Sequence, residues 1–490
     1  MGLLLNDYIC DIFLYMIKLL IGAATSGSGK TTFTMGLLRA LSRRGLRVQP
    51  FKCGPDYIDT QFHSIAAGRE SVNLDTWMAS PDHVREVFAR YSADADVAVI
   101  EGVMGLFDGY DRMHGSSAEI AALLDVPVVL VVNARSTAYS VAALLHGMKT
   151  FRPDVRIAGV VFNQVASESH YSFLKAAADD AGVPSLGWIP RADGVEVPSR
   201  HLGLTIGMEQ EIDALADRAA DLIEHNWDVS SCINASDCTE LFGVSVSETI
   251  DARVAVNGRG PRPKGVGGIG PERAVVSDAD TPKSSPNNAL TTQDEPSLLR
   301  IAVARDRAFN FTYRENIDRL REIGEVVFFS PLAGDELPEA DLVYLPGGYP
   351  ELFAPELSLN RTLASQLVQF AENGGRILAE CGGMMYLGKS VTDQDCKVWP
   401  MAGVLPIECT MDSARLHLGY RKMTVGGVEF KGHEFHYSSI VDSDVLPALK
   451  IQTNAKKQPV DTALYRYRNV IAGYTHWYWG ETDINALWEL

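Results

Sequence analysis

The chain has 490 residues, of which 46% are apolar and 22% are charged, as is ordinary for a globular protein of two or three domains. Its 44 basic and 62 acidic residues give a formal net charge of −18 at pH 7, which argues against nucleic-acid binding and favours a cytoplasmic protein. The seven cysteines are scattered and do not form the pattern of a disulfide framework.

The first 15 residues form an unusual N-terminal segment. They are apolar, but the charges are acidic and no small-residue cleavage site follows, so the segment is a poor signal peptide. It is also too short and too interrupted to span a membrane. Because Met16 directly precedes the first expected strand, we expect the natural start at Met16 and treat residues 1–15 as an extension.

A strand, a glycine-rich loop and a helix follow in that order. Residues 16–21 are an apolar run typical of a buried strand, and residues 32–42 carry apolar side chains at helical spacing. Between them, residues 24–31 fit a phosphate-loop pattern, with Ala in place of the first Gly. In such a loop the lysine reaches the nucleotide phosphates and the final hydroxyl ligates Mg²⁺. The predicted ATP-binding residues here are Gly27, Gly29, Lys30, Thr31 and Thr32.

Carboxylates follow the next two expected strands. Asp56 and Asp59 come after the strand at 48–51, and Glu101 ends the apolar strand that begins at residue 96. Asp108 lies on the glycine-rich loop after Glu101. Because parallel strands point their carboxyl ends at one crevice, these four acids suit metal-assisted phosphoryl transfer.

Further strands are expected at 126–132 and 157–162. Asn163 follows the second of them, where it could contact the adenine edge or cap a turn. Strands and helices alternate through residue 225, which predicts a doubly wound α/β domain over residues 16–227. Residues 228–298 are rich in Gly, Pro, Ser, Asn and Asp, a composition that predicts a flexible linker. Residues 299–490 are then expected to form a second domain.

A cysteine lies at the tip of a sharp turn in this second domain. The strand at 376–380 runs into Cys381, and Gly382 and Gly383 open a short helix. Such an elbow exposes the thiol to backbone N–H groups and the positive end of a helix, which activates it and can stabilise an oxyanion. Another strand, at 341–345, ends near two glycines that can present an N–H group to the same oxyanion.

A thiol nucleophile needs a base. The downstream histidines are His417, His433, His436 and His476, and we favour His476, which follows a short strand near the chain end. The alternative interpretation of His433 and His436 is a polar strand that faces a groove.

These segments together resemble the cobyrinic acid a,c-diamide synthase family. The resemblance covers residues 16–227 and 299–480 and rests on several long, unusual motifs. The motifs are residues 52–59, 101–109, 198–204, 301–311, 345–351 and 379–387. The resemblance implies a glutamine-dependent amidoligase whose first domain is similar to dethiobiotin synthetase and whose second is similar to class I glutamine amidotransferases.

The family resemblance also implies the substrates. They are ATP, L-glutamine and the a and c acetate groups of a corrinoid ring. Related members act on hydrogenobyrinic acid or, in the coenzyme F430 pathway, on nickel-sirohydrochlorin, and the sequence does not decide between the rings. The sequence does not determine the oligomeric state, and a homodimer is one hypothesis.

The roles carried over by the resemblance are specific. Cys381 and His476 would release ammonia from glutamine, with Gly348 and Gly382 as the oxyanion hole. Thr31, Asp56 and Glu101 would hold Mg²⁺, and Asp59 and Asp108 would act in substrate binding or phosphoryl transfer. Asn163 is added to the nucleotide contacts. The candidate contacts to the ring are Tyr57, Arg200 and His201.

One departure from the wider amidotransferase pattern stands out. Many class I enzymes carry His-x-Glu, but Trp477 and Tyr478 follow His476 here, which predicts a Cys–His pair with slow or domain-dependent glutaminase turnover. Two other classes of protein fit these residues less well. A nucleotide-switch ATPase with an inactive amidotransferase-like module would be expected to lose the thiol, and a glutaminase alone leaves the phosphate loop unexplained.

Overall fold

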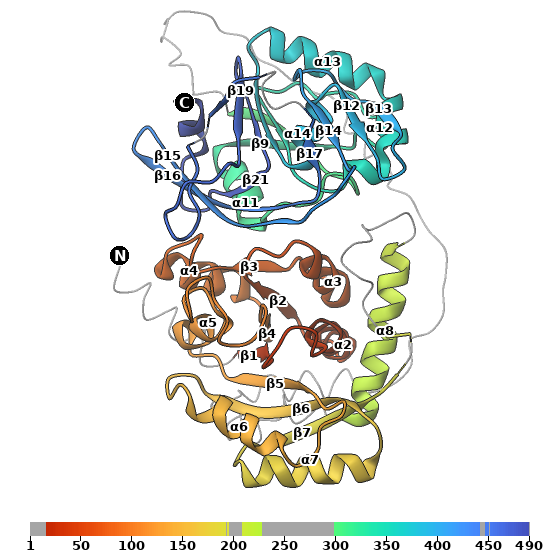
Figure 1. The fold of residues 1–490 in the computed structure, drawn as a ribbon, viewed down its shortest axis with the longest axis vertical. Coiled ribbons are helices and arrows are strands. Elements are labelled where there is room, and N and C mark those ends of the chain that lie inside the picture. The colour runs from red at the N-terminus through yellow and green to blue at the C-terminus, as the bar shows by residue number, and fades with distance from the viewer. Residues whose placement is uncertain are drawn as a thin grey trace, which may run out of the picture.

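The computed structural model describes residues 16–192, 194–195, 208–227, 298–441, 446–449 and 451–489. They form two halves that are stacked one above the other in Figure 1, each around its own seven-stranded sheet. The extension at 1–15, nearly all of the linker at 228–298, and the candidate ring contacts Arg200 and His201 lie outside the described residues.

The first half alternates strands and helices along the chain. Its elements are β1 (Ile17–Gly22), α2 (Lys30–Arg43), β2 (Val48–Cys53), α3 (Ile58–Ala67), β3 (Val72–Leu74), α4 (Pro81–Ser92), β4 (Val97–Glu101), α5 (Ser117–Leu124), β5 (Val128–Asn133), α6 (Val141–Thr150), β6 (Ile157–Val165), α7 (Glu168–Asp180), β7 (Ser185–Pro190) and α8 (Met208–Asn226). Every strand pairing is parallel, in the order β3-β2-β4-β1-β5-β6-β7. The predicted doubly wound α/β architecture is therefore confirmed.

Helices cover both faces of this sheet. Phe33 and Leu38 of α2 pack with Ile212 and Ile223 of α8 against one face, and helices α4 to α7 supply the core on the other face. Because both faces are buried, the central strands are almost continuously apolar. The carboxyl ends of β1, β2, β4 and β6 consequently meet at one edge, where the phosphate loop begins.

The second half combines a central sheet with two smaller sheets. Its elements are β8 (Leu299–Ala304), α11 (Arg314–Ile323), β9 (Gly324–Phe329), β10 (Leu342–Leu345), η2 (Pro350–Phe353), α12 (Ala354–Leu359), α13 (Arg361–Glu372), β11 (Arg376–Glu380), α14 (Gly382–Leu387), β12 (Ser390–Thr392), β13 (Val398–Pro400), β14 (Glu408–Thr410), β15 (His417–Val425), β16 (Val428–His436), β17 (Ser439–Ile440), β18 (Ala448–Leu449), β19 (Leu464–Tyr467), β20 (Val470–Gly473), β21 (Thr475–Tyr478) and η3 (Ile484–Glu489). The central order is β18-β19-β20-β11-β10-β8-β9.

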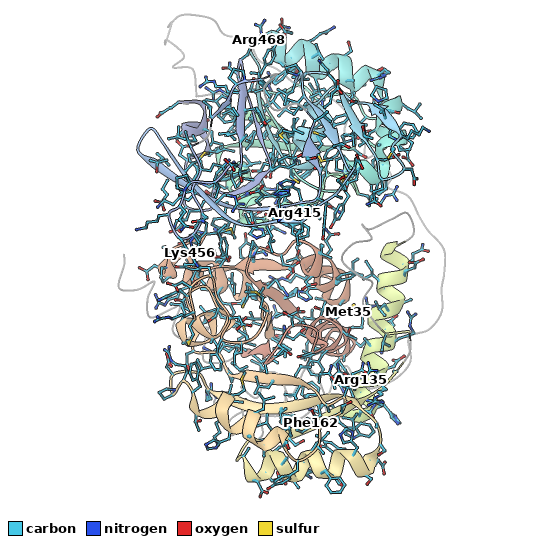
Figure 2. The ribbon with its side chains drawn as sticks, viewed as in Figure 1. Met35, Arg135, Phe162, Arg415, Lys456 and Arg468 are labelled. Carbon is cyan, nitrogen blue, oxygen red and sulfur yellow. The ribbon has the colours of Figure 1, made fainter. Side chains whose placement is uncertain are left out.

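The sheets of the second half bring its chain end next to the elbow. Strands β8 to β11 and β20 pair in parallel, whereas β18, β19 and β20 pair antiparallel. The three-stranded sheet β15-β16-β21 carries His476 opposite His433. In Figure 1 this sheet lies on the side of the second half that faces α4 and β3, and side chains fill the boundary between the halves (Figure 2). Among the described helices, none is long and apolar enough to cross a membrane.

Candidate active site

The phosphate loop joins the end of β1 to the start of α2. Gly27 and Gly29 have φ angles of 74° and 91°, a region that favours glycine. A Cβ on Gly29 would lie 2.1 Å from Asn163 Nδ2, whereas at Gly27 nothing lies within 4 Å. The Asn163 amide donates to the Ser28 carbonyl oxygen at 3.0 Å, so Asn163 braces the loop from β6. Its predicted contact with adenine stays a prediction.

The first turn of α2 carries the three predicted nucleotide-binding side chains. Lys30 is buried, and its ammonium donates to the Met104 carbonyl oxygen at 2.6 Å. The Thr31 hydroxyl donates to Glu101 Oε1 at 2.9 Å, and Thr32 is partly exposed in the same turn. Lys30 therefore already lies beside the loop that follows β4.

A buried lysine lies between two of the carboxylates. Lys52 Nζ donates to Asp59 Oδ2 at 2.6 Å and to Glu101 Oε1 at 2.7 Å, and His63 Nε2 lies 2.7 Å from Glu101 Oε2. Burial by itself raises the pKa of Glu101, but Lys52 and His63 outweigh it and hold that pKa well below its usual range. Glu101 is therefore an ionised carboxylate at the centre of a charged cluster.

Of the two aspartates that follow β2, Asp59 lies within hydrogen-bond distance of the phosphate-loop hydroxyl. Thr31 Oγ1 is 3.4 Å from Asp59 Oδ2, so oxygens of Thr31, Asp59 and Glu101 gather at one point. Asp56 Oδ1 instead accepts the backbone N–H groups of Ile58 and Asp59 at 2.9 and 3.0 Å, at the start of α3. Oxygen ligands of this kind suit Mg²⁺, and the exact ligand set stays a prediction.

Asp108 shapes the loop after β4. Its Oδ2 accepts the Gly105 N–H at 3.0 Å, and a Cβ on Gly105 would lie 2.5 Å from this oxygen and 2.7 Å from the Ala24 carbonyl oxygen. The loop therefore packs closely on the phosphate loop. The predicted role of Asp108 in phosphoryl transfer stays a prediction, since its hydrogen bond in the structure is to this turn.

The cysteine elbow has the strained geometry expected of a nucleophile turn. Cys381 has φ 46° and ψ −106°, an uncommon conformation for a residue with a side chain. A Cβ on Gly382 would lie 3.0 Å from Gly348 N, and one on Gly383 would lie 2.1 Å from the Leu345 carbonyl oxygen. Glycines at these positions therefore let the elbow approach the Gly348 loop, which brings the two predicted oxyanion donors to one place.

His476 lies on β21 and packs against the same loop. A Cβ on Gly347 would lie 2.0 Å from His476 Cε1, so only glycine leaves room for the ring. A backbone hydrogen bond with Phe311 favours the charged form of the ring. Burial, with His433 and His436 nearby, lowers the pKa of His476 to about 3. The imidazole is therefore neutral near pH 7, the form that a base needs, and its low pKa makes it a weak base in this conformation.

The thiol is a protonated, buried group in this conformation. Burial raises the pKa of Cys381 well above its ordinary value, and the Glu351 carboxyl raises it further, while the Gly382 N–H lowers it. Cys381 Sγ lies 3.7 Å from the Phe435 carbonyl oxygen. The thiol therefore needs a base before it can attack, which agrees with the neutral ring of His476.

Glu380 ties the elbow to the strand of His476. Its Oε2 accepts the Tyr344 hydroxyl at 2.7 Å and its Oε1 accepts the Trp477 N–H at 3.0 Å. Burial raises the pKa of Glu380 to about 8. Because Glu380 precedes Cys381 and Trp477 follows His476, one carboxyl group fixes the spacing of the two strands.

The acids and histidines of β16 form a separate network. Glu434 contacts Arg421 and lies 2.7 Å from His436 Nε2, and His436 Nδ1 lies 2.8 Å from the Ser438 carbonyl oxygen. His417, Glu434 and His436 are close enough to share a metal ion, but the Arg421 cation at the carboxylate opposes one. The alternative interpretation of His433 and His436, a polar strand that faces a groove, stays a prediction, and Tyr478 supplies no carboxylate to His476.

Sequence reasoning missed Lys52, His63 and the bridging role of Glu380. The available signal was a charged residue inside an otherwise buried strand: Lys52 lies in β2 and Glu380 ends β11, and every residue of β2 is buried. His63 carried no signal, because the partner that explains it is 38 positions away along the chain.

Two family models match the two halves. Residues 19–204 match the CobQ/CobB/MinD/ParA nucleotide binding domain, and residues 300–484 match the CobB/CobQ-like glutamine amidotransferase domain. Each match contains one of the two sites built above.

Curated relatives extend over nearly the whole chain. A cobyrinate a,c-diamide synthase of Picrophilus torridus is 38% identical over 94% of this chain and 95% of its own. That of Priestia megaterium is 37% identical over 95% and 94%, and a hydrogenobyrinate a,c-diamide synthase of Brucella abortus is 39% identical over 93% and 97%. The chain belongs to the a,c-diamide synthase family. It is a ligase that uses glutamine as the amido donor, as predicted.

In this synthase-family member the two sites share a wall. Tyr57 lies between Asp56 and the first residue of α3, and its ring lies 4.9 Å from the His476 ring and 5.2 Å from the Phe311 ring, centroid to centroid. Tyr313 lies 4.9 Å away on another side. The turn that leads to Asp59 therefore contacts the candidate base of the other half.

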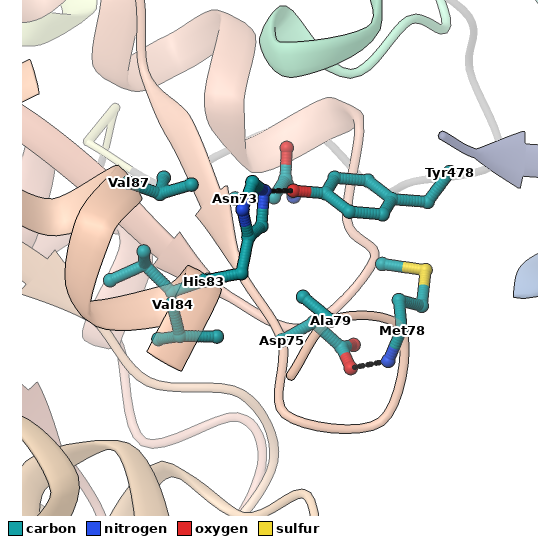
Figure 3. A pocket seen from close by; sticks show the side chains of 9 residues that line it. Asn73, Asp75, Met78, Ala79, His83, Val84, Val87 and Tyr478 are labelled. Carbon is teal, nitrogen blue, oxygen red and sulfur yellow. Dashed lines mark hydrogen bonds between the residues drawn. The ribbon is translucent and has the colours of Figure 1, made fainter. Parts of the chain in front are cut away.

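The synthase halves also join around β3 and α4. The Tyr420 hydroxyl donates to Asp75 Oδ2 at 2.7 Å, and its ring stacks on Trp77 at 4.5 Å. Figure 3 shows a small cavity between β3, α4 and the Tyr478 side chain, with His83 Nε2 2.9 Å from the Tyr478 hydroxyl. The boundary is thus packed and hydrogen-bonded rather than a loose contact between two domains.

Proposed function

We propose that the chain amidates the a and c acetate carboxylates of cobyrinate, using ATP and glutamine, in cobalamin biosynthesis. The observation that supports this most is Tyr57, which joins the turn of Asp59 to the ring of His476. Glutamine hydrolysis and carboxylate activation would then occur on two sides of one packed wall. The domains are taken as residues 16–227 and 299–490.

Ammonia release follows from the second site. His476 takes the thiol proton while Cys381 Sγ attacks the glutamine side-chain carbon, and the Gly348 and Gly382 N–H groups receive the oxyanion. The tetrahedral intermediate collapses to a thioester as the protonated ring gives its proton to the leaving ammonia. Water then hydrolyses the thioester to glutamate and restores the thiol.

Carboxylate activation follows from the first site. An acetate oxygen attacks the γ-phosphorus of ATP and gives an acyl phosphate and ADP, and ammonia then displaces phosphate to form the amide. Lys30 would contact the transferred phosphoryl group, and the Gly27 and Gly29 backbone would cradle the phosphates. Mg²⁺, held by Thr31, Glu101 and Asp59 or Asp56, would supply charge neutralisation. Lys52 and His63 keep the Glu101 carboxylate ionised.

The ring is the least constrained part of the proposal. Nickel-sirohydrochlorin is the alternative substrate, with the same chemistry in the coenzyme F430 pathway, and one enzyme acting on both rings fits the same sites. The reactive thiol suits a reducing, cytoplasmic setting.

Product mass tests the proposal. Purified protein is incubated with ATP, MgCl₂ and glutamine plus cobyrinic acid or nickel-sirohydrochlorin, and we expect two successive carboxyl-to-amide mass changes on the true substrate. In Cys381→Ser the reaction should stop with glutamine and continue with ammonium chloride. ATP hydrolysis without amidation of either ring would instead favour a nucleotide-switch ATPase.

A further inference from the structure

Buried polar atoms without partners gather at the boundary between the two sites. They come from both halves and have no hydrogen-bond partner among the described residues. The atoms are Gln61 Nε2, Asn310 Oδ1, Tyr349 Oη and His433 Nδ1. An unsatisfied buried polar group is destabilising. A small polar molecule that forms hydrogen bonds with several of these groups would therefore stabilise the cluster.

One pair in this cluster crosses the boundary. Asn310 Nδ2 donates to Gln61 Oε1 at 3.4 Å, which leaves the Asn310 carbonyl oxygen and the Gln61 amide nitrogen without partners. Gln61 lies on α3, two positions after Asp59. A long bond of this length is weak, so each amide can exchange it for a bond to a passing molecule.

Asn310 lies on the loop that frames the glutaminase site. The next residue, Phe311, donates its N–H to the Gly347 carbonyl oxygen at 3.0 Å. On the other side, a Cβ on Gly348 would lie 2.1 Å from the Ala308 carbonyl oxygen. Asn310 is therefore held between the residues that contact Gly347 and Gly348. The Gln61–Asn310 pair consequently links that loop to the helix that begins beside the carboxylate cluster.

The chemistry of the pair suits ammonia. A primary amide offers an oxygen that accepts an ammonia N–H and a nitrogen that donates to the ammonia lone pair. Neither amide titrates, so neither can convert ammonia to the non-nucleophilic ammonium ion. Of the acidic side chains nearby, Glu380 is hydrogen-bonded with Tyr344 and Trp477, and Glu434 contacts Arg421 and His436. The Glu351 carboxyl lies on the Cys381 side of the pair.

We propose that Gln61 and Asn310 form the crossing through which ammonia passes from the Cys381 site to the carboxylate site. This inference rests on the proposed function and deepens it, since it names the side chains that carry the shared intermediate. The two residues position ammonia and take no part in either bond-forming step.

The test is the stoichiometry of the two half-reactions in the full chain. Asn310→Leu and Gln61→Met keep side-chain volume and remove the amides. Glutamate release and amide formation on the ring are measured in the same reaction with glutamine. Amide formation is then measured again with ammonium chloride in place of glutamine. We expect about one glutamate per amide in the wild type, a several-fold higher ratio in each variant, and ammonium-supported amidation within about twofold of wild type.

A matched control removes a different contact across the boundary. Glu481 accepts from the Ser80 backbone and hydroxyl at 2.6 Å, away from both sites, and Glu481→Ala should keep the wild-type ratio. Unchanged coupling in both amide variants would overturn the inference. So would loss of ammonium-supported activity in a variant with a wild-type melting temperature, because the residue would then serve the synthetase step. Wild-type protein that makes no amide from either nitrogen source would overturn the proposed function and the inference together.

Discussion

Lys52 shows how one residue organises the first site. It is buried, and it bonds to Asp59 and Glu101 at 2.6 and 2.7 Å. Two carboxylates this close would otherwise repel each other in a medium of low dielectric constant. The lysine therefore offsets the repulsion between the two acids, and with His63 it keeps Glu101 ionised.

Removal of the Lys52 charge should destabilise the protein. Lys52→Met leaves two buried carboxylates without their common counter-ion, and we expect the free energy of unfolding of the apo protein to fall by about 3–5 kcal/mol. Urea unfolding measures it. Because the two carboxylates lack their lysine counter-ion in the variant, MgCl₂ should raise the free energy of unfolding of the variant more than that of the wild type. A loss below about 1 kcal/mol would show that the cluster is neutral rather than ionised.

His476 should leave a signature in the pH dependence of stability. Its folded pKa, about 3, lies below the ordinary 6.5, so below pH 6.5 the unfolded state binds the extra proton. Stability is then fully present above pH 6.5 and is lost as pH falls towards 3, with a slope approaching about 1.4 kcal/mol per pH unit. Urea unfolding of wild type and His476→Gln at pH 7.5 and 4.5 checks this. The variant should lose less stability on acidification, and parallel losses would contradict the assignment.

At the scale of elements, the elbow and the Gly347–Gly348 loop depend on close backbone approach. The sequence indicated the turn at Cys381 from its flanking glycines, and the structure adds that each glycine faces a specific neighbour. Gly383 faces the Leu345 backbone, Gly382 faces Gly348, and Gly347 faces His476. The strand ends and the turn therefore fit together only without side chains at these positions.

Gly347→Ala tests this fit. The added Cβ would lie 2.0 Å from His476 Cε1, so the ring must shift, and we expect the glutamine-dependent rate to fall by about 100-fold or more. Ammonium-supported amidation should remain, because the first site is untouched. Gly147→Ala, where nothing lies within 4 Å, is the control and should stabilise α6 by about 0.4–1 kcal/mol. Equal loss with both nitrogen sources would show that the substitution acts on folding instead.

At the scale of the whole molecule, a buried boundary joins the two halves. Asp75 accepts the Tyr420 hydroxyl at 2.7 Å, while burial raises the pKa of Asp75 despite this bond and two backbone N–H bonds. A carboxylate in this position depends on every donor that it has. The boundary therefore contributes to the stability of both halves.

Tyr420→Phe removes one of those donors and should lower the free energy of unfolding by about 1–3 kcal/mol. Tyr139→Phe is a matched control, since Tyr139 also bonds to a carboxylate, that of Asp180, but is 52% exposed. The free energy of unfolding of Tyr139→Phe should differ from that of the wild type by less than about 0.5 kcal/mol. Urea unfolding compares them, and similar losses in both variants would mean that burial of the boundary contributes nothing.

The fold class, the family and the order of the two sites could all be predicted from the amino-acid sequence. Apolar runs that alternate with helical periodicity specify a parallel sheet, and the phosphate loop and the cysteine elbow are local motifs whose chemistry lies within a few consecutive residues. For this reason the positions of Lys30, Thr31 and Cys381 could be predicted without knowing any long-range contact.

Contacts between side chains that are distant in the sequence could not be predicted and became visible in the folded chain. Lys52, Asp59, His63 and Glu101 lie on three different elements of the first half, and Asn310 reaches Gln61 across 249 positions of the chain. No local pattern records such pairs, because packing of strands and helices brings them together. The same packing puts Asp59 beside Thr31 and directs Asp56 to the backbone of α3, a distinction between two acids three residues apart that their spacing alone could not make.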